Sequence, residues 1–230
     1  MPASNSACED AFELSPSNST VILGTTISAS LPTNAPCGGP RSTKGVWYSV
    51  EGEEGQLLRA STCSNGTNFA SVVTVISGGC RSYECIGVKY YYEGRCNGYG
   101  AILDWESSST TYYIFVSGPY GGIAGNFELT VEEVMRPSND ECTGAIMLAL
   151  DSEALMGSTF DASIERINFS FCGSYIQSPG LWYAIEGTGS GLRASTCLNH
   201  TEYSTEIAAS QSLSQTTAST GIALTSLQAC

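Results

Sequence analysis

A long internal repeat constrains this chain more than any other feature. The stretch 45–67 reads GVWYSVEGEEGQLLRASTCSNGT, and the stretch 180–201 reads GLWYAIEGTGSGLRASTCLNHT. Landmarks of the first copy and their counterparts in the second are Asn5 and Asn139, Cys8 and Cys142, Cys37 and Cys172, Trp47 and Trp182, Tyr48 and Tyr183, Arg59 and Arg193, and Cys63 and Cys197. The period of about 135 residues exceeds the roughly 20–50 residues of solenoid repeats, so each copy is predicted to be a domain.

The duplication therefore predicts two domains in 230 residues, each long enough to enclose an apolar core. We place the first at residues 1–134 and the second at residues 139–230, joined by the short linker 135–138, MRPS.

The composition favours strands joined by turns. Charged residues make up 13 % of the chain, glycine occurs 25 times, and no long stretch has the amphipathic period of a helix. Runs rich in β-branched and aromatic residues predict about eight strands in the first domain. They cover residues 20–30, 45–50, 57–63, 69–77, 85–92, 101–105, 111–117 and 126–134. We therefore predict an all-β fold of two tandem antiparallel β-sandwiches. The strand at 45–50 has apolar side chains on both faces, so it should be covered from both sides.

The second copy stops at Cys230 and has no counterpart of residues 97–134, so the second sandwich should lack its last strands. Such a sheet exposes apolar surface and unpaired edges. Our main expectation is that the chain continues in a longer protein. Alternatively, a second chain supplies the strands, as in donor-strand complementation, or the sandwich closes with fewer strands.

Acidic residues outnumber basic ones by 22 to 9, which gives a formal charge of −13. This charge opposes binding to nucleic acid or to an anionic membrane. No apolar run approaches the ~20 residues of a membrane-spanning helix, so membrane insertion is not expected either.

Ten cysteines, with few close pairs and a single histidine, predict disulfides and no metal site. Cys80 and Cys85 of the first copy are both serine in the second, Ser214 and Ser219, so we expect those two cysteines to pair with each other. The remaining predicted pairs are Cys8 with Cys37, Cys63 with Cys96, Cys142 with Cys172, and Cys197 with Cys230.

Disulfides imply an oxidising compartment, so the protein should be secreted, although no signal peptide begins at Met1. Asn-x-Ser/Thr sequons at Asn18, Asn65, Asn168 and Asn199 then predict covalent N-glycans on exposed loops. Asn65 and Asn199 occupy the same position of the repeat.

Catalysis is not expected, and we predict that the chain is not an enzyme. Nucleophile systems need a histidine base, and the one histidine, His200, lies inside a sequon. Adjacent carboxylates at 53–54, 132–133 and 140–141 diverge on a strand or sit in turns, so they do not suit glycoside hydrolysis. Arg59 and Arg193 should pair structurally with carboxylates such as Glu51 and Glu186.

Aromatic residues offer one alternative to a purely structural chain. Tyr90, Tyr91 and Tyr92, with Tyr99 and Tyr120, could form a platform for sugar rings. Because neighbouring residues of a strand face opposite ways, ordinary sheet packing is the simpler interpretation. Trp47 and Trp182 are interpreted as packing anchors in the same way.

Several motifs resemble the pre-peptidase C-terminal (PPC)-like modules of large secreted or surface proteins. They are N-x-x-C-x-x-A at Asn5 and Asn139, G-[VL]-W-Y at Gly45 and Gly180, LRASTC, the GGC turn at Gly78, and YYIFVSG followed by GNFELTV. The resemblance implies a jelly-roll-like β-sandwich that is non-catalytic and serves as an appendage or building block. Some bacterial relatives bind calcium, but here YYYEGRC and SLQAC replace the usual Asn-Asp cluster before the last cysteine. We therefore expect no cofactor, with calcium as the open alternative.

The leading functional hypothesis is a secreted, glycosylated structural protein that associates with itself in a cell-surface layer or extracellular fibril. The alternative is a carbohydrate-binding or targeting module of a larger secreted hydrolase.

Overall fold

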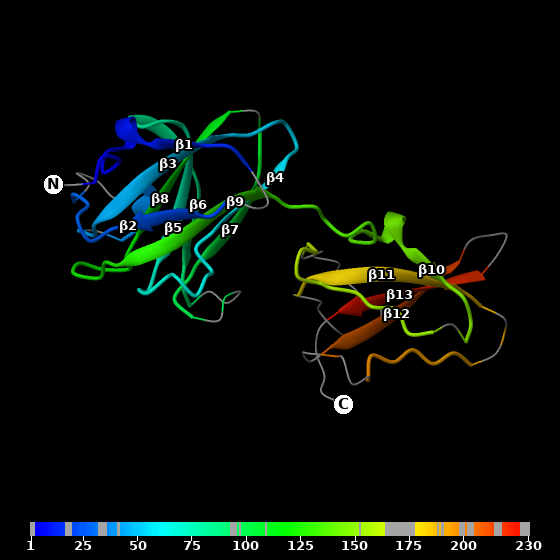
Figure 1. Ribbon diagram of the computed structural model, residues 1–230. Coiled ribbons are helices and arrows are strands. Elements are labelled where there is room, and N and C mark those ends of the chain that lie inside the picture. Colours follow the sequence, from blue (N-terminus) through cyan, green and yellow to red (C-terminus); the bar gives the residue numbers. More distant parts are fainter. Residues whose placement is uncertain are drawn as a thin grey trace. The chain divides into compact units, whose positions relative to one another are not determined.

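The computed structural model describes residues 3–16, 20–31, 36–40, 42–92, 96, 98–108, 110–151, 153–163, 178–187, 189, 191–197, 201, 205–213 and 218–225. The chain divides into two compact units, Met1–Val134 and Met135–Cys230, with residues 135–138 grouped in the second (Figure 1).

The described part of the first unit contains β-strands and two single 3-10 turns. The strands are β1 (Phe12–Leu14), β2 (Ile22–Thr25), β3 (Gly45–Glu51), β4 (Leu57–Ser61), β5 (Val72–Gly79), β6 (Ser82–Tyr90), β7 (Ile102–Glu106), β8 (Thr111–Ser117) and β9 (Asn126–Glu133), and the turns are η1 (Cys8–Asp10) and η2 (Pro36–Gly38). The all-β prediction is confirmed. Strand β1, in the AFEL run, was not expected from the sequence.

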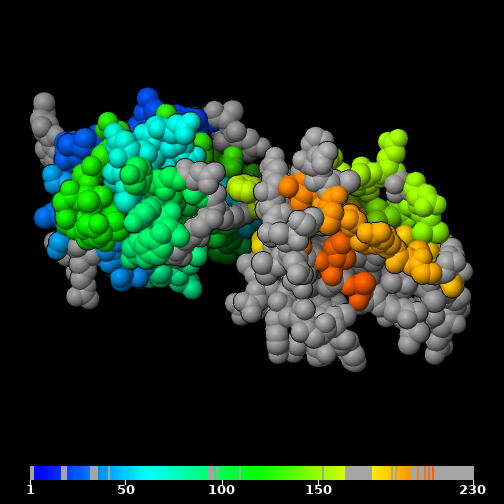
Figure 2. Space-filling view, turned by 90° about the horizontal axis from the view of Figure 1, so that it is seen from below, coloured from blue at the N-terminus to red at the C-terminus, as the bar shows by residue number. Residues whose placement is uncertain are grey.

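Two sheets face each other in the first unit. One has the strand order β1-β3-β8-β5-β6 and the other β2-β9-β4-β7, and every neighbouring pair is antiparallel except β1 with β3. Segments far apart in sequence meet at the edges of this sandwich. For example, the Thr26 amide donates to the carbonyl of Gly125 at 2.9 Å, and in Figure 2 blue N-terminal and green later residues of the first unit lie side by side.

The core lies between the two sheets because each strand sends alternate apolar side chains inward. Tyr48, Val75, Ile114, Leu58 and Phe127 are among its fully or nearly fully buried members. Burial of such side chains contributes about 1.5–3 kcal/mol each.

The outer face of the β3 sheet is also covered, as expected for a strand that is apolar on both sides. Trp47, Ile76 and Phe115 form a second buried cluster there, with Cys8 and Cys37 packed against it. The Trp47 and Phe115 ring centroids are 4.7 Å apart. A side chain at Gly45 would collide with the Phe115 ring, which explains the glycine before VWY.

The described part of the second unit contains a single sheet. Its elements are η3 (Cys142–Gly144), β10 (Ile146–Leu148), β11 (Gly180–Glu186), β12 (Glu206–Leu213) and β13 (Ala218–Thr225), with the strand order β10-β11-β13-β12. The parallel pair of β10 and β11 repeats the pair of β1 and β3.

Strand β11 corresponds to β3 of the first unit, but its antiparallel neighbour comes from a different part of the repeat. By sequence, β12 and β13 correspond to the hairpin β5–β6, yet β13 pairs with β11 in the register that β8 has with β3. Ile222 stands opposite Tyr183 as Ile114 stands opposite Tyr48. The hairpin of the second unit therefore occupies the position that β8 holds in the first.

Candidate functional site

A pair of hydrogen bonds, which we call the Asn–Trp clasp, is the same in both units. The Asn5 side-chain amide donates to the Trp47 carbonyl at 2.9 Å, and the Trp47 amide donates to the Asn5 carbonyl at 2.8 Å. Asn139 and Trp182 make the same two bonds at 3.0 and 2.8 Å. The clasp fixes the segment before each 3-10 turn against β3 or β11, and because it uses the asparagine side chain and the tryptophan backbone, it explains why the asparagine recurs.

The disulfides of the first unit correct two predicted pairs. Cys8 is joined to Cys80 and Cys37 to Cys85, with Cα–Cα distances of 5.6 and 5.2 Å. The predicted pairs of Cys8 with Cys37 and of Cys80 with Cys85 are therefore wrong. Cys85 stands opposite Ile76 in the hairpin and Cys80 lies in its turn, so the two are not cross-strand neighbours. The Cys8–Cys80 disulfide connects the hairpin to the N-terminal segment, and the Cys37–Cys85 disulfide connects it to η2.

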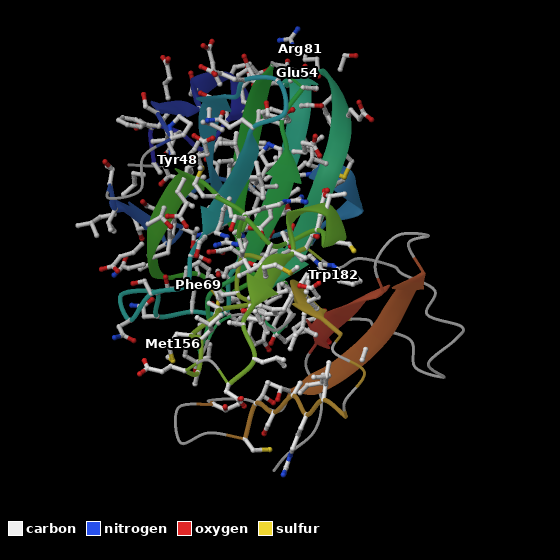
Figure 3. All side chains as sticks on the ribbon, turned by 90° about the vertical axis from the view of Figure 1, so that its right-hand side faces the viewer. Tyr48, Glu54, Phe69, Arg81, Met156 and Trp182 are labelled. Carbon is white, nitrogen blue, oxygen red and sulfur yellow. A yellow bond between two sulfur atoms is a disulfide. The ribbon has the colours of Figure 1, made fainter. Side chains whose placement is uncertain are left out.

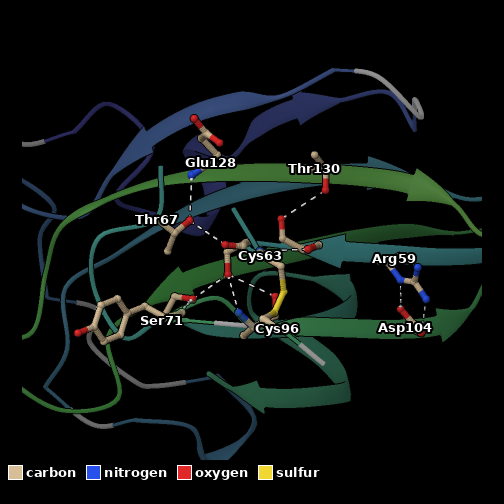
Figure 4. Close-up of a disulfide and its surroundings, with 12 residues drawn as sticks. Arg59, Cys63, Thr67, Ser71, Cys96, Asp104, Glu128 and Thr130 are labelled. Atoms are coloured by element: carbon tan, nitrogen blue, oxygen red, sulfur yellow. Dashed lines mark hydrogen bonds and ion pairs between the residues drawn. A yellow bond between two sulfur atoms is a disulfide. The ribbon is translucent and has the colours of Figure 1, made fainter. Parts of the chain in front are cut away.

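Cys63 is joined to Cys96, the pair expected from the sequence (Figure 4). Beside it, the Thr62 and Ser71 hydroxyls are 2.7 Å apart, and the Thr67 hydroxyl donates to the Thr62 carbonyl at 2.7 Å.

The cysteines of the second unit fit the corrected pattern only in part. Cys142 is exposed and free, so it is not in the predicted pair with Cys172, which lies outside the described residues. The partners that Cys8 and Cys37 have in the first unit are serines in the second copy. Cys197 is disulfide-bonded, and its predicted partner Cys230 also lies outside the described part.

An open cavity of about 820 Å³ lies at the hairpin end of the first unit, and we call it the hairpin cavity. It is bordered by residues 3–4, 6–10 and 30–31, by Pro36, by the Cys8–Cys80 disulfide and by the β5–β6 hairpin. Trp47 and Ile76, which are almost fully buried, line its inner side. Figure 3 shows Arg81, one of its lining residues, at the end of the unit away from Phe69.

Polar and aromatic groups line the rim of the hairpin cavity. Glu9 and Asp10 come from η1, and Arg81 and Tyr83 come from the hairpin. Arg81 Nε lies 3.5 Å from Glu9 Oε1 with both side chains largely exposed, so this ion pair contributes little stability. Tyr83 is 42 % exposed, which leaves much of its ring open to a ligand.

The tyrosines singled out by the sequence lie elsewhere. Tyr90 and Tyr92 stack with ring centroids 5.4 Å apart, and Tyr91 meets Tyr92 edge-on at 5.3 Å. Within this tyrosine cluster Tyr92 is mostly exposed, and Tyr99 is exposed as well. The tyrosine cluster begins at Tyr90, seven residues along β6 from Tyr83. At about 3.4 Å per residue of strand, it therefore lies roughly 24 Å from the hairpin cavity. Tyr120, also exposed, follows β8.

Arg59 is buried and forms a structural ion pair, although not with the expected partner. Its Nε lies 2.7 Å from Asp104 Oδ1, and a second nitrogen lies 3.0 Å from Oδ2, so the pair is bidentate (Figure 4). Glu132 is 3.9 Å away. The expected pair with Glu51 is wrong because Asp104 stands directly opposite Arg59 on β7. Arg193 of the second unit is exposed.

The described residues include no cluster of three or more His, Cys, Asp or Glu side chains that could hold a metal ion. Glu53 and Glu54 lie exposed in the turn between β3 and β4, while Asp140 is buried beside Arg136. His200 lies outside the described residues. No helix in the described part is long and apolar enough to cross a bilayer.

Of the four sequons, only Asn65 lies among the described residues, while Asn18, Asn168 and Asn199 lie outside them. Asn65 is exposed in a turn closed by the Thr67 amide donating to the Ser64 carbonyl. Thr67 is buried, so its hydroxyl serves the fold as well as the sequon.

Comparison with known proteins finds a likeness in structure but no matching family. No family model and no curated protein matches the chain. The pre-peptidase C-terminal domain of collagenase from Bacillus anthracis is similar over 53 % of this chain and 94 % of its own, at 16 % identity and a TM-score of 0.32. A likeness at this level carries no conclusion about function.

Proposed function

We propose that this protein is a non-catalytic, extracellular structural protein, a building block of a cell-surface layer or fibril. The observation that carries the proposal is that the LRAS segment is buried in the first unit and exposed in the second. LRAS at 58–61 is central in its sheet, with Leu58 fully buried, whereas in LRAS at 192–195 Leu192 is 38 % exposed. We propose that strands of a neighbouring subunit cover this surface of the second unit.

Sedimentation of residues 1–230 over a wide concentration range tests self-association. We expect oligomers that grow with concentration and filaments or sheets in electron micrographs. Leu192→Asp should abolish them, because a charge on the contact surface is costly to bury. Leu155→Asp, at a residue that is exposed outside any strand, is the matched control. A wild-type protein that stays monomeric at every concentration would contradict the proposal.

Secretion and glycosylation are part of the same proposal. Three disulfides in the first unit support an oxidising compartment. In secreting eukaryotic cells, Asn65 should carry a glycan that an N-glycosidase removes. Asn65→Gln should lose that mass and keep its stability, since the side chain is exposed. Thr67→Ala should lose the glycan mass, because the sequon is destroyed, and should also lower the stability, because the buried hydrogen bond from the Thr67 hydroxyl to the Thr62 carbonyl is removed.

A second candidate function is glycan targeting within a larger secreted protein. It is favoured by the hairpin cavity and by the exposed tyrosines of the first unit. Specific retention on a glycan array by a protein that remains monomeric would favour targeting over the structural role.

A further inference from the structure

We propose that the hairpin cavity binds an uncharged, hydroxyl-rich ligand, namely one or a few sugar residues of a glycan. The inference deepens the second candidate function and is independent of the building-block proposal.

The shape of the cavity suits a small ligand. Its volume of about 820 Å³ falls within the range of roughly 300–1,000 Å³ typical of ligand pockets. The Cys8–Cys80 disulfide ties the N-terminal segment of the lining to the hairpin, and the Asn–Trp clasp ties the same segment to Trp47, so these walls are fixed before a ligand arrives. Such preorganisation lowers the entropy cost of binding.

The lining has the chemistry that a sugar requires. The Glu9 and Asp10 carboxylates accept hydrogen bonds from hydroxyl groups, and the Arg81 guanidinium donates them. The half-exposed Tyr83 ring offers an apolar surface with a polar tip to the C–H face of a pyranose. The two carboxylates oppose an anion, and the hydroxyl groups of a neutral polyol can donate to the carboxylates and accept from Arg81 at the same time.

The second copy shows which of these residues the scaffold itself does not need. By sequence, Glu9 and Asp10 become Thr143 and Gly144, and Tyr83 becomes Thr217. Cys80 and Arg81 are replaced as well, by Ser214 and Gln215. The second unit nevertheless keeps the Asn–Trp clasp and the parallel strand pair. The lining of the cavity is therefore a property of the first unit and not of the fold.

Titration calorimetry of the full chain with cellohexaose, laminarihexaose, chitohexaose and mannohexaose tests the inference. We expect at least one hexasaccharide to bind, and Tyr83→Ala and the double variant Glu9→Gln/Asp10→Asn to weaken it at least tenfold. Tyr92→Ala, at another exposed tyrosine, is the matched control and should bind like wild type. Peptide mapping of Cys8–Cys80 in each variant verifies that the cavity wall is intact.

Two results would overturn the inference and can be told apart. If wild type binds a hexasaccharide and only Tyr92→Ala loses it, the tyrosine cluster is the site, so the cavity inference fails while glycan targeting stands. If wild type binds none of the four, and no glycan of a wider array, both the cavity inference and the targeting function fail.

Discussion

At the scale of single residues, Asn5 and Asn139 perform the same task in two different settings. Each side-chain amide donates to the carbonyl of a buried tryptophan. Loss of such a bond leaves a buried acceptor unsatisfied, which costs about 1–3 kcal/mol.

We therefore expect Asn5→Ala to lower the free energy of unfolding of the first unit by about 1–3 kcal/mol in urea, because the Trp47 carbonyl loses its donor. Asn139→Ala should act in the same way on the second unit only. Ser4→Ala, at an exposed neighbour, is the control. Equal effects of Ser4→Ala and Asn5→Ala would contradict a structural role for the clasp.

The buried Tyr48 side chain should make the free energy of unfolding of the first unit depend on pH. Burial raises its pKa to about 12, although a hydrogen bond with the Asn5 side chain lowers it somewhat. An unfolded tyrosine ionises near pH 10, so the proton is lost earlier in the unfolded state. The stabilising contribution is complete below pH 10 and is lost as the pH rises from 10 to 12, by about 2–3 kcal/mol in total.

The free energy of unfolding of the first unit, measured by denaturant titration from pH 8 to 11.5, should fall more steeply in wild type than in Tyr48→Phe. Phenylalanine cannot ionise, and it keeps the ring contact with Phe127. Parallel pH profiles for the two proteins would contradict the buried, protonated phenol.

At the scale of elements, the β5–β6 hairpin is held by two disulfides that reach distant segments. The sequence separations are 72 and 48 residues. Cross-links over such distances restrict the unfolded chain, and each stabilises the fold by about 2–4 kcal/mol.

Digestion without reduction should release peptides that join Cys8 to Cys80 and Cys37 to Cys85. Cys80→Ser should lower the free energy of unfolding of the first unit by about 2–5 kcal/mol, because the linkage to η1 is lost. Cys142→Ser, at a cysteine that is free, is the control. Recovery of a peptide that joins Cys80 to Cys85 would restore the simpler pairing predicted from the repeat.

At the scale of the whole molecule, the four-residue sequence LRAS has a different structure in each of the two units. LRAS at 58–61 is a strand because β7 and β9 bind both of its edges. LRAS at 192–195 is not a strand, and the described part of the second unit contains no counterparts of β7 and β9.

Limited digestion with trypsin tests this difference. Arg193 is exposed outside any strand and Arg59 is 4 % exposed within one, so cleavage after Arg193 should be at least tenfold faster. Mass spectrometry should find a resistant fragment that contains the first unit. Equal rates at the two arginines would show that the second unit protects its LRAS segment in solution.

The sequence by itself determined the duplication, the all-β class and the approximate place of most strands, because alternation and turn residues are local signals. It also indicated Cys63 with Cys96, since that spacing recurs in both copies. Only the tertiary structure decided the remaining pairs in the first unit, the Asp104 partner of Arg59 and the hairpin cavity. Each of these depends on which segments meet across the sandwich, and sequence spacing does not encode those distances.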